Sequence, residues 1–387
     1  MRRWWPWCAA TLLLLWQVDF QFTYGFVADA VQNDVGISAA QATAVSSVFL
    51  LAYGAMQLPA GLLIDRFGVR WVLPIAGWAA AGAVLWFARS QSFVDLASAR
   101  VFAGAFMAFM FPAAGKIARI KLPAARFALA MALADMCLGI GAVTAGNMAT
   151  LITRLDWRSL MTIHAAVGVS IATIVAVSLR GMPRPSVVAR DEPSIDFLVL
   201  VTKRRVVLAA GLYAWGAGLA FAFGGYWNLR LQAACHCTAP QVSALSTALF
   251  AGLAIGMLAS GVYATSASKR RIALRVGTVA TLILLAWILW KSATASFGEL
   301  VVPMVLLGAG LGTSALSFAV AIPGIPKHQA GTVVAVVNAA GCLGGALLQE
   351  LPIWLGGDTE SLDMMRVIYV ITSVVGVLLA LRLRVDE

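Results

Sequence analysis

Twelve runs of mostly apolar residues, each long enough to cross a bilayer as a helix, dominate this 387-residue sequence. A helix rises about 1.5 Å per residue, so about 20 residues cross the roughly 30 Å hydrocarbon core. The runs are 8–29, 39–61, 71–89, 94–116, 126–150, 158–179, 206–228, 241–263, 272–290, 299–321, 330–350 and 364–382. The pattern predicts an all-α integral membrane protein with twelve transmembrane helices.

The composition agrees with lipid as the solvent. Hydrophobic residues make up 61% of the chain and charged residues 12%, whereas soluble domains carry roughly 25% charged residues. Met1-Arg2-Arg3 and the following apolar stretch resemble a signal peptide, but the stretch continues to Ala28 and contains Gln17 and Asp19. We therefore expect it to be retained as the first span.

One long hydrophilic stretch divides the spans six and six. It contains three prolines and mixed charges, which is typical of a linker. We predict an N-terminal six-helix bundle at 1–180, a cytoplasmic linker at 181–205 and a C-terminal six-helix bundle at 206–387. Cys137-Leu-Gly-Ile-Gly141 is echoed by Cys342-Leu-Gly-Gly-Ala346, which indicates an internal duplication.

The net charge of +11 comes from short basic clusters between the apolar runs. When the 28 Lys and Arg residues are assigned to alternate ends of the spans, 21 fall on one side and 6 on the other, with Arg100 inside the membrane. The positive-inside rule then predicts a multi-pass protein of the inner (plasma) membrane, with both termini cytoplasmic. The clusters form no basic patch interleaved with aromatic residues, so we expect no nucleic-acid partner.

A loop motif links the sequence to a known family. The segment Gly61-Leu-Leu-Ile-Asp65-Arg66-Phe-Gly68-Val-Arg70 resembles the motif between the second and third helices of the major facilitator superfamily. The resemblance implies two pseudo-symmetric six-helix bundles, alternating access and a monomer. We expect Gly61 to allow a close helix approach and Gly68 to allow a tight turn.

The same resemblance implies a gate. Asp65 is expected to bind a basic group at the end of the fourth span, Lys116 or Arg119, and the start of the eleventh helix near Gly331. An anion is favoured at a helix N-terminus. These contacts would hold the cytoplasmic side closed in the outward-open state.

The fourth span contains a second match. Arg100-Val-Phe-Ala-Gly104 resembles the start of a family motif whose arginine is linked to proton transfer. An arginine inside the membrane is costly, so it should face a partner or a wet cavity; the alternative is that it snorkels to the surface. The fifth span departs from the family's antiporter signature, because Gly141 and Gly146 fit but Ala142 stands where the proline belongs.

The first span is polar on two faces. Gln17, Gln21 and Tyr24 share one face, and Asp19 lies on another. We therefore expect this helix to lie inside the bundle and line a cavity. Asp19, near mid-membrane, is the leading candidate for proton binding; the alternative is a carboxylate held permanently by hydrogen bonds.

Asp135 in the fifth span is the second candidate for proton binding, unless it pairs with a loop arginine. The second half offers uncharged groups for substrate contact: Tyr213, Trp215, Ser314, Ser317 and Asn338. Tyr226-Trp227-Asn228 is expected to form an interface belt, with an external gate as the alternative.

We therefore expect a secondary active transporter that moves a small organic solute by alternating access, driven by the proton gradient without a cofactor or metal. Symport is favoured over drug or metabolite efflux by antiport, because the antiporter proline is missing. A membrane enzyme or a non-transporting sensor is a remote alternative, since His164, His236 and His328 lie on separate segments and no Walker loop occurs. Cys235-His236-Cys237 matches no common zinc spacing, and a disulfide there stays open.

Overall fold

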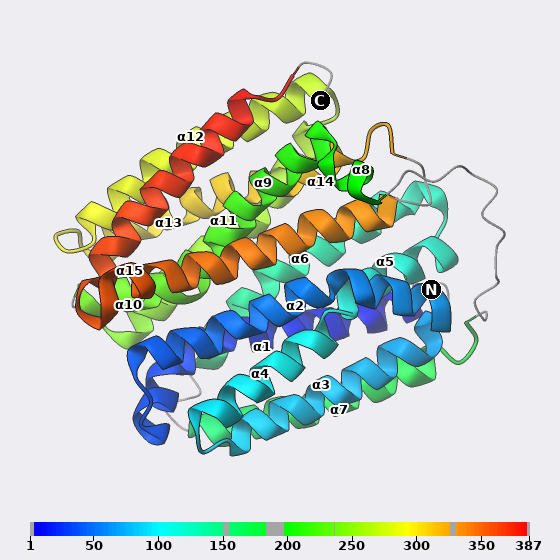
Figure 1. Cartoon of the computed structure of the whole chain (residues 1–387), viewed down its shortest axis with the longest axis horizontal. Helices are drawn as coiled ribbons and strands as arrows, with labels where there is room; N and C mark the ends of the chain where they lie inside the picture. The colour runs from blue at the N-terminus through cyan, green and yellow to red at the C-terminus, as the bar shows by residue number, and fades with distance from the viewer. Residues whose placement is uncertain (1–3, 150–154, 183–196, 236, 326–329, 385–387) are drawn as a thin grey trace.

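The computed structural model describes residues 4–149, 155–182, 197–235, 237–325 and 330–384, and within these residues all regular structure is helical (Figure 1). A few side chains inside the helices, among them those of Asp65 and Asp135, also fall outside the described part. Most of the predicted linker, residues 183–196, falls outside it too.

Each apolar run of the first half forms a helix. The helices are α1 (Trp5–Val35), α2 (Ala39–Phe67), α3 (Val69–Arg89), α4 (Phe93–Met107), α5 (Met110–Lys121), α6 (Ala124–Ala149) and α7 (Trp157–Ser178). The fourth predicted span is divided between α4 and α5, with a short break after Met107.

The second half repeats this arrangement with more interruptions. The elements are α8 (Phe197–Thr202), α9 (Arg204–Leu219), the π-helix η2 (Ala220–Trp227), α10 (Asn228–Ala234), α11 (Ala239–Tyr263), α12 (Ala267–Lys291), α13 (Phe297–Gly312), the 3₁₀-helix η3 (Thr313–Leu316), α14 (Ser317–Ala321) and α15 (Ala330–Leu381). The seventh span thus runs through α9, η2 and α10, and the tenth through α13, η3 and α14.

The 52 residues of α15 contain the last two spans, Thr332–Gly356 and Ser361–Leu381. Figure 1 shows the ribbon of α15 running to one end of the molecule and then doubling back. The Tyr369 hydroxyl donates a hydrogen bond to the Leu348 carbonyl at 3.1 Å, although a straight helix would separate these residues by roughly 30 Å. The predicted end of the eleventh span at residue 350 was too early, because the helix continues through Pro352 before it reverses.

Helix ends follow local chemistry. Ser38 and Gln41 form a reciprocal capping box at the start of α2, and Gly36 ends α1 with a φ of 73°. Gly68 joins α2 to α3 with a φ of 83°, which confirms the predicted tight turn. The prediction for Gly61 is wrong in this structure, because a Cβ atom there would meet nothing within 4 Å.

Ten of the described helical segments are long and apolar enough to cross a membrane. The other two predicted spans are α1, whose polar residues lower its hydropathy, and α6, where several side chains lie outside the described part. Large apolar side chains face outward, with Val262 71% exposed and Leu62 67% exposed. The protein is therefore a multi-pass membrane protein with the predicted set of twelve spanning helices.

We call the end of the molecule where α7 ends and α9 begins the linker end, and the opposite end the distal end. The two halves lie against each other along α2 with α15 and α6 with α11. Small residues permit this packing: a Cβ atom on Gly25 of α1 would lie 2.1 Å from the Gly225 carbonyl oxygen in η2, and one on Gly139 would lie 2.7 Å from the Ala254 Cβ.

Candidate functional site

A narrow central cavity lies where the two halves meet. Its polar lining comes from both halves: Gln17 and Gln21 of α1, Tyr53 of α2, Tyr213 of α9 and Asn338 of α15. The remaining lining residues are apolar and include aromatic rings and a thioether: Leu14, Val18, Phe111, Ala134, Leu138, Phe221, Met257 and Cys342. The cavity holds about 50 Å³, room for a few water molecules, whereas ligand sites usually offer about 300 Å³ or more. A solute can enter only if the halves separate.

The α1 face that lines this cavity is the one predicted from its polar spacing. The Gln17 amide nitrogen donates to the Gln21 amide oxygen at 3.1 Å, and both side chains are buried. Tyr24 does not line the cavity, since its hydroxyl donates to the Ala42 carbonyl at 2.7 Å inside the first half. The expectation that α1 lies inside the bundle and lines a cavity is confirmed.

Asp19 faces away from the cavity and meets a histidine. Its Oδ2 lies 3.4 Å from Nδ1 of His164, a residue of α7, and both side chains are buried. Trp16 fixes the histidine: the two rings stack at 5.4 Å, and the indole nitrogen donates to the His164 carbonyl at 2.9 Å. Gly141 of α6 packs against this point of α1, since a Cβ there would lie 2.6 Å from Val18.

Arg100 does not reach the surface. Its side chain is only 1% exposed, and its Nε donates to the Val45 carbonyl at 3.3 Å. The guanidinium carbon lies over four aromatic rings, at 4.9 Å from Phe20, 4.8 Å from Tyr24, 4.5 Å from Phe49 and 6.0 Å from Phe87. One terminal nitrogen has no hydrogen-bond partner among the described residues. The snorkelling alternative is therefore excluded, and a cation–π cage holds the charge.

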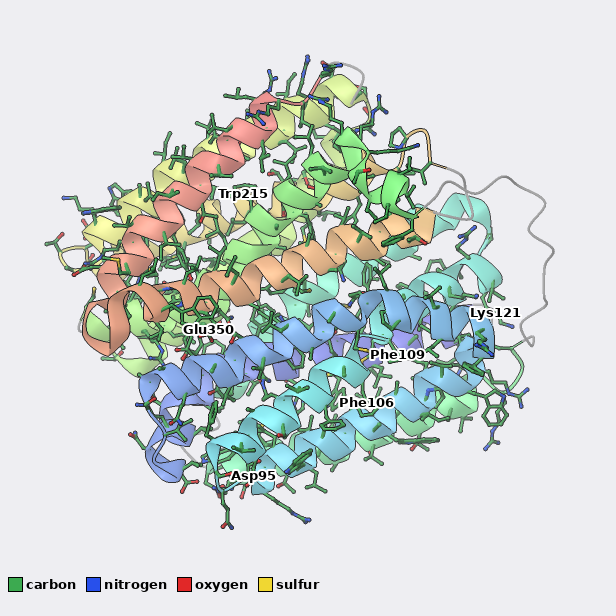
Figure 2. All side chains as sticks on the ribbon, viewed as in Figure 1. Asp95, Phe106, Phe109, Lys121, Trp215 and Glu350 are labelled. Atoms are coloured by element: carbon green, nitrogen blue, oxygen red, sulfur yellow. The ribbon has the colours of Figure 1, made fainter. Side chains whose placement is uncertain are left out.

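Two side-chain contacts that join the halves lie toward the distal end. The Ser47 hydroxyl of α2 donates to Oε1 of Glu350 in α15 at 2.5 Å, and the hydroxyls of Thr43 and Tyr226 are 2.9 Å apart. Figure 2 shows Glu350 between the ribbons of α15 and α2, at the opposite end of the molecule from Lys121.

Tyr226-Trp227-Asn228 does not form an interface belt. All three side chains are at most 1% exposed. The Trp227 indole donates to the Gln349 carbonyl at 3.0 Å, and the Asn228 amide donates to the Ser246 hydroxyl at 2.9 Å. The sequence suggested a belt because aromatic residues at a span end are usually lipid-facing, but the π-helix η2 turns these residues toward α2, α11 and α15.

The other candidates of the second half lie in packing contacts. Trp215, labelled in Figure 2 on the second half, is buried and lies against Gly376 of α15. Ser314 lies against Gly216, and Ser317 is fully buried. None of these three is among the described residues that line the cavity.

The loop motif is placed at the linker end. The guanidinium carbon of Arg66 lies 5.4 Å from the Phe67 ring, and that of Arg70 lies 5.2 Å from the Trp71 ring. Arg119 is exposed near the end of α5, three residues from Lys116. The side chains of Asp65 and Asp135 lie outside the described part, so the gate and the role of Asp135 stay predictions.

Sequence reasoning missed His164, Ser47 and Glu350. The sequence signals were weak: a histidine within an apolar run and a glutamate at the end of another are common without function. Only the packing of α7 on α1, and of α15 on α2, brings them to their partners. Cys235 and Cys237 are free thiols in this structure, and burial raises the pKa of both; His236 lies outside the described residues.

The profile of the Major Facilitator Superfamily matches residues 10–348. The chain belongs to the major facilitator superfamily. This confirms the resemblance inferred from the loop motif and makes the chain a member of a transporter family.

Curated relatives match parts of the chain. The uncharacterized transporter YybO of Bacillus subtilis is 33% identical over 134 residues, 34% of this chain and 30% of the relative. The tetracenomycin C resistance and export protein of Streptomyces glaucescens is 27% identical over 275 residues, 66% of this chain and 49% of the relative. A probable galactarate/D-glucarate transporter of Bacillus subtilis is 27% identical over 159 residues, 39% of this chain and 35% of the relative. The matches thus span at most half the length of these relatives.

Solved structures share the fold. A bacterial homologue of the human lysosomal transporter Spinster, inward-facing and unoccupied, superposes with a TM-score of 0.73 at 15% identity. The match covers 98% of this chain and 96% of that one. The occupied inward-facing form gives a TM-score of 0.72 at 15% identity, over 97% and 94% of the two chains. At this identity the likeness shows the twelve-helix fold alone.

Proposed function

We propose that this protein is a proton-coupled secondary transporter that imports a small organic solute across the inner membrane by alternating access. The observation that carries the proposal is the buried Asp19–His164 pair beside the cavity-lining face of α1. The linker end is proposed to face the cytoplasm, and the two halves to move as bundles 1–180 and 206–387.

The pair is suited to hold a proton. A carboxylate in an apolar interior needs its own proton or a positive partner. If Asp19 is ionised, His164 must be protonated; if Asp19 is protonated, His164 is neutral, and the pair holds one proton in either case. Loss of that proton would leave a buried charge without compensation and favour a conformation in which water reaches α1.

A movement of α1 would change the shape of the cavity. Gln17, Val18 and Gln21 line the cavity, whereas Asp19 lies between them in the sequence and faces α6 and α7. A shift of the helix that opens the pair to water therefore also moves the two glutamines. This arrangement couples the charge of the pair to the shape of the solute site.

The cavity favours a solute that is recognised through hydrogen bonds. Its described polar lining consists of amides and phenols, which bind hydroxyl, carbonyl and amide groups. The hydroxyl–carboxylate and hydroxyl–hydroxyl contacts at the distal end support a state closed on that side. Solute and proton would then exchange with the linker side.

The proposal is tested in proteoliposomes with a solute found by thermal stabilisation across a compound library. A proton gradient should drive accumulation by the native protein. Asp19→Asn should abolish accumulation but retain solute counterflow, because the cavity is unchanged. Asp29→Asn, which alters an exposed carboxylate on the same helix, is the matched control and should retain both activities. Gradient-driven accumulation by Asp19→Asn would contradict the coupling role.

Export of a planar drug or metabolite is the second candidate. The tetracenomycin C export protein aligns with 66% of this chain, and the cavity lining includes Phe111, Phe221 and Met257, which suit an apolar ring system. Overexpression should then raise the tolerated concentration of such compounds. Uptake without any change in susceptibility would favour import.

A further inference from the structure

The two glutamines of α1 leave hydrogen-bonding groups unused beside the central cavity. The bond between them joins the Gln17 nitrogen to the Gln21 oxygen. The Gln17 Oε1 atom is buried and has no hydrogen-bond partner within the described part of the chain. A buried acceptor without a donor is unfavourable. Because Gln17 lines the cavity, a molecule that enters it can supply the donor.

The unused groups are the same in kind whichever way the two amides are turned. Each amide has one oxygen that accepts and one nitrogen that donates. If both amides were rotated, Gln21 would donate to Gln17, and the unused groups would be the Gln17 nitrogen and the Gln21 oxygen. In both orientations the pair presents one acceptor and one donor, one helical turn apart.

A chemical group that both donates and accepts fits this pair. A hydroxyl or a carboxamide can donate to the unused oxygen and accept from the unused nitrogen. An ionised carboxylate only accepts, so it would leave the amide oxygen without a donor. An ammonium only donates, so it would leave the amide nitrogen without an acceptor. The glutamine pair therefore favours an uncharged partner.

Two buried ionisable residues of the first half, Arg100 and Asp19, do not line the cavity. Arg100 lies among aromatic rings of the first half, and Asp19 faces His164. The described residues that line the cavity include no charged side chain. A charged solute would lose its hydration there without gaining an opposite charge from them.

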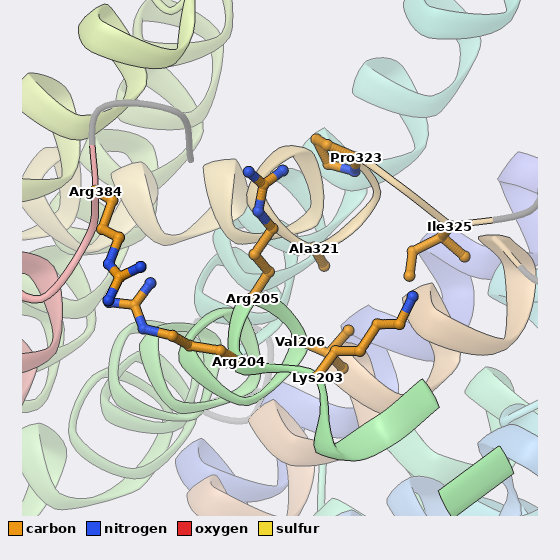
Figure 3. A pocket seen from close by; sticks show the side chains of 8 residues that line it. All are labelled: Lys203, Arg204, Arg205, Val206, Ala321, Pro323, Ile325 and Arg384. Atoms are coloured by element: carbon orange, nitrogen blue, oxygen red, sulfur yellow. The ribbon is translucent and has the colours of Figure 1, made fainter. Parts of the chain in front are cut away.

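The cationic side chains at the linker end of the second half line a different pocket (Figure 3). Lys203, Arg204, Arg205 and Arg384 surround a space of about 260 Å³. None of these four is among the described residues that line the central cavity. The three arginines also interact with other groups of the protein, and Arg204 donates to the Arg382 carbonyl at 2.5 Å. These charges therefore do not serve a solute in the central cavity.

The remaining lining suits the rest of an uncharged solute. Tyr53 and Asn338 offer a phenol and an amide, which again both donate and accept. Phe111, Phe221 and Met257 offer apolar surface, against which a ring or a carbon skeleton can pack.

We propose that the solute is an uncharged molecule whose hydroxyl or carboxamide group bridges Gln17 and Gln21, with its less polar part against Phe111, Phe221 and Met257. Gln17 and Gln21 then determine the specificity for this class. The inference rests on the proposed function in taking the central cavity as the solute site. It does not depend on proton coupling or on the direction of transport.

Binding is tested with the purified full-length protein in a neutral detergent, where no gradient acts. Thermal unfolding is followed with three matched series: benzamide, benzoate and benzylamine; glucose and gluconate; uridine and uridine monophosphate. In at least one series the uncharged member should stabilise the protein at a concentration about tenfold or more below its charged members, since one lost hydrogen bond and one unpaired group give about that factor. Stabilisation by a charged member at an equal or lower concentration, or by no uncharged member, would overturn the proposal.

Two variants test whether the glutamines make this contact. Gln17→Leu and Gln21→Leu should each weaken binding of the stabilising uncharged compound about tenfold. Gln32→Leu makes the same change on α1 outside the cavity, and this matched control should bind as the native protein does. The unfolding temperature without ligand shows whether each variant folds. Native affinity in both well-folded cavity variants would exclude the glutamines from solute recognition and overturn the proposal.

A transport measurement separates failure of this inference from failure of the proposed function. The same compounds are offered to proteoliposomes with and without a proton gradient. Binding of the uncharged compound through the glutamines without gradient-driven accumulation would contradict proton-coupled import but support the solute class. Gradient-driven accumulation of benzoate, gluconate or uridine monophosphate, and not of the uncharged partner, would support the proposed function and overturn the uncharged solute.

Discussion

At the scale of single residues, the two halves use the same packing but different chemistry. Trp16 packs on Gly168 in the first half, and Trp215 packs on Gly376 in the second. Three residues after Trp16 comes Asp19; three residues after Trp215 comes Gly218.

The partner position differs in the same way. His164 stands four residues before Gly168, whereas Thr372 stands four residues before Gly376. The histidine meets Asp19, but the Thr372 hydroxyl donates to the Ile368 carbonyl of its own helix. The Asp19–His164 pair therefore has no counterpart at the repeated positions, which supports ion coupling by the first half alone.

Arg100 differs from its repeat in a way that can be tested. Gly104 packs on the Phe49 carbonyl and Gly308 on the Leu249 carbonyl, so Met304 is the repeat of Arg100, and Met304 is fully buried. Burying a charge costs several kcal/mol, whereas a cation–π contact returns about 0.5–2 kcal/mol. We expect Arg100→Met to leave the free energy of unfolding unchanged or to raise it by about 1–3 kcal/mol, and to abolish transport.

Arg100→Ala is the comparison for that prediction. It removes the same charge but leaves a cavity between the four rings, and should lower the free energy of unfolding by about 2–5 kcal/mol. Thermal unfolding in detergent and uptake in proteoliposomes measure the two effects. If Arg100→Met were as unstable as Arg100→Ala, the contact between the guanidinium and the four rings would be needed for folding. If Arg100→Met still transported solute, the charge would not be needed for transport.

At the scale of helices, the sequence predicted which segments form helices better than it predicted the contacts between those helices. Every predicted span forms a helix, because a run of apolar residues must satisfy its backbone internally in lipid. The π-helix η2 and the reversal inside α15 were not predicted, since both depend on packing against neighbouring helices. The cavity face of α1 could be predicted because two glutamines on one face of an apolar helix have few other uses; the Ser47–Glu350 contact could not.

The distal contacts of α2 are predicted to control access to the cavity. Ser47→Ala with Thr43→Val removes the Ser47–Glu350 and Thr43–Tyr226 hydrogen bonds. Each bond contributes on the order of 1 kcal/mol, so the population open at the distal end should rise about thirtyfold. Cys342 lines the cavity and is buried, so its labelling by an impermeant maleimide from the distal side measures this opening.

That measurement uses a protein in which Cys342 is the one remaining cysteine, with the other four changed to serine. Ser46→Ala is the matched control, because Ser46 is also buried on α2 but donates no described hydrogen bond to the second half. Equal labelling in the double variant and the control would show that the polar contacts do not hold the distal end closed.

At the scale of the whole molecule, glycine positions show where the halves can move. Gly308 of α13 lies so close to α11 that a Cβ would come within 1.8 Å of the Leu249 carbonyl oxygen. That contact is inside one half and fixes its helices against each other. Contacts between the halves, such as Gly146 of α6 with Thr247 of α11, must instead be able to separate if solute is to enter so small a cavity.

Two glycine–threonine contacts allow this distinction to be tested with cross-links. A Cβ on Gly146 would lie 2.5 Å from the Thr247 hydroxyl oxygen, across the halves toward the distal end; one on Gly277 would lie 2.1 Å from the Thr313 hydroxyl oxygen, within the second half. Cysteine pairs at both places, in a background without native cysteines, should form disulfides on oxidation.

Alternating access predicts that the 146–247 disulfide stops transport until a reductant is added, because the distal end can no longer open. The 277–313 disulfide should leave the rate nearly unchanged, because α12 and α13 move together. Full transport with an intact 146–247 disulfide would show that the halves need not part at the distal end, and the rocking mechanism would have to be abandoned.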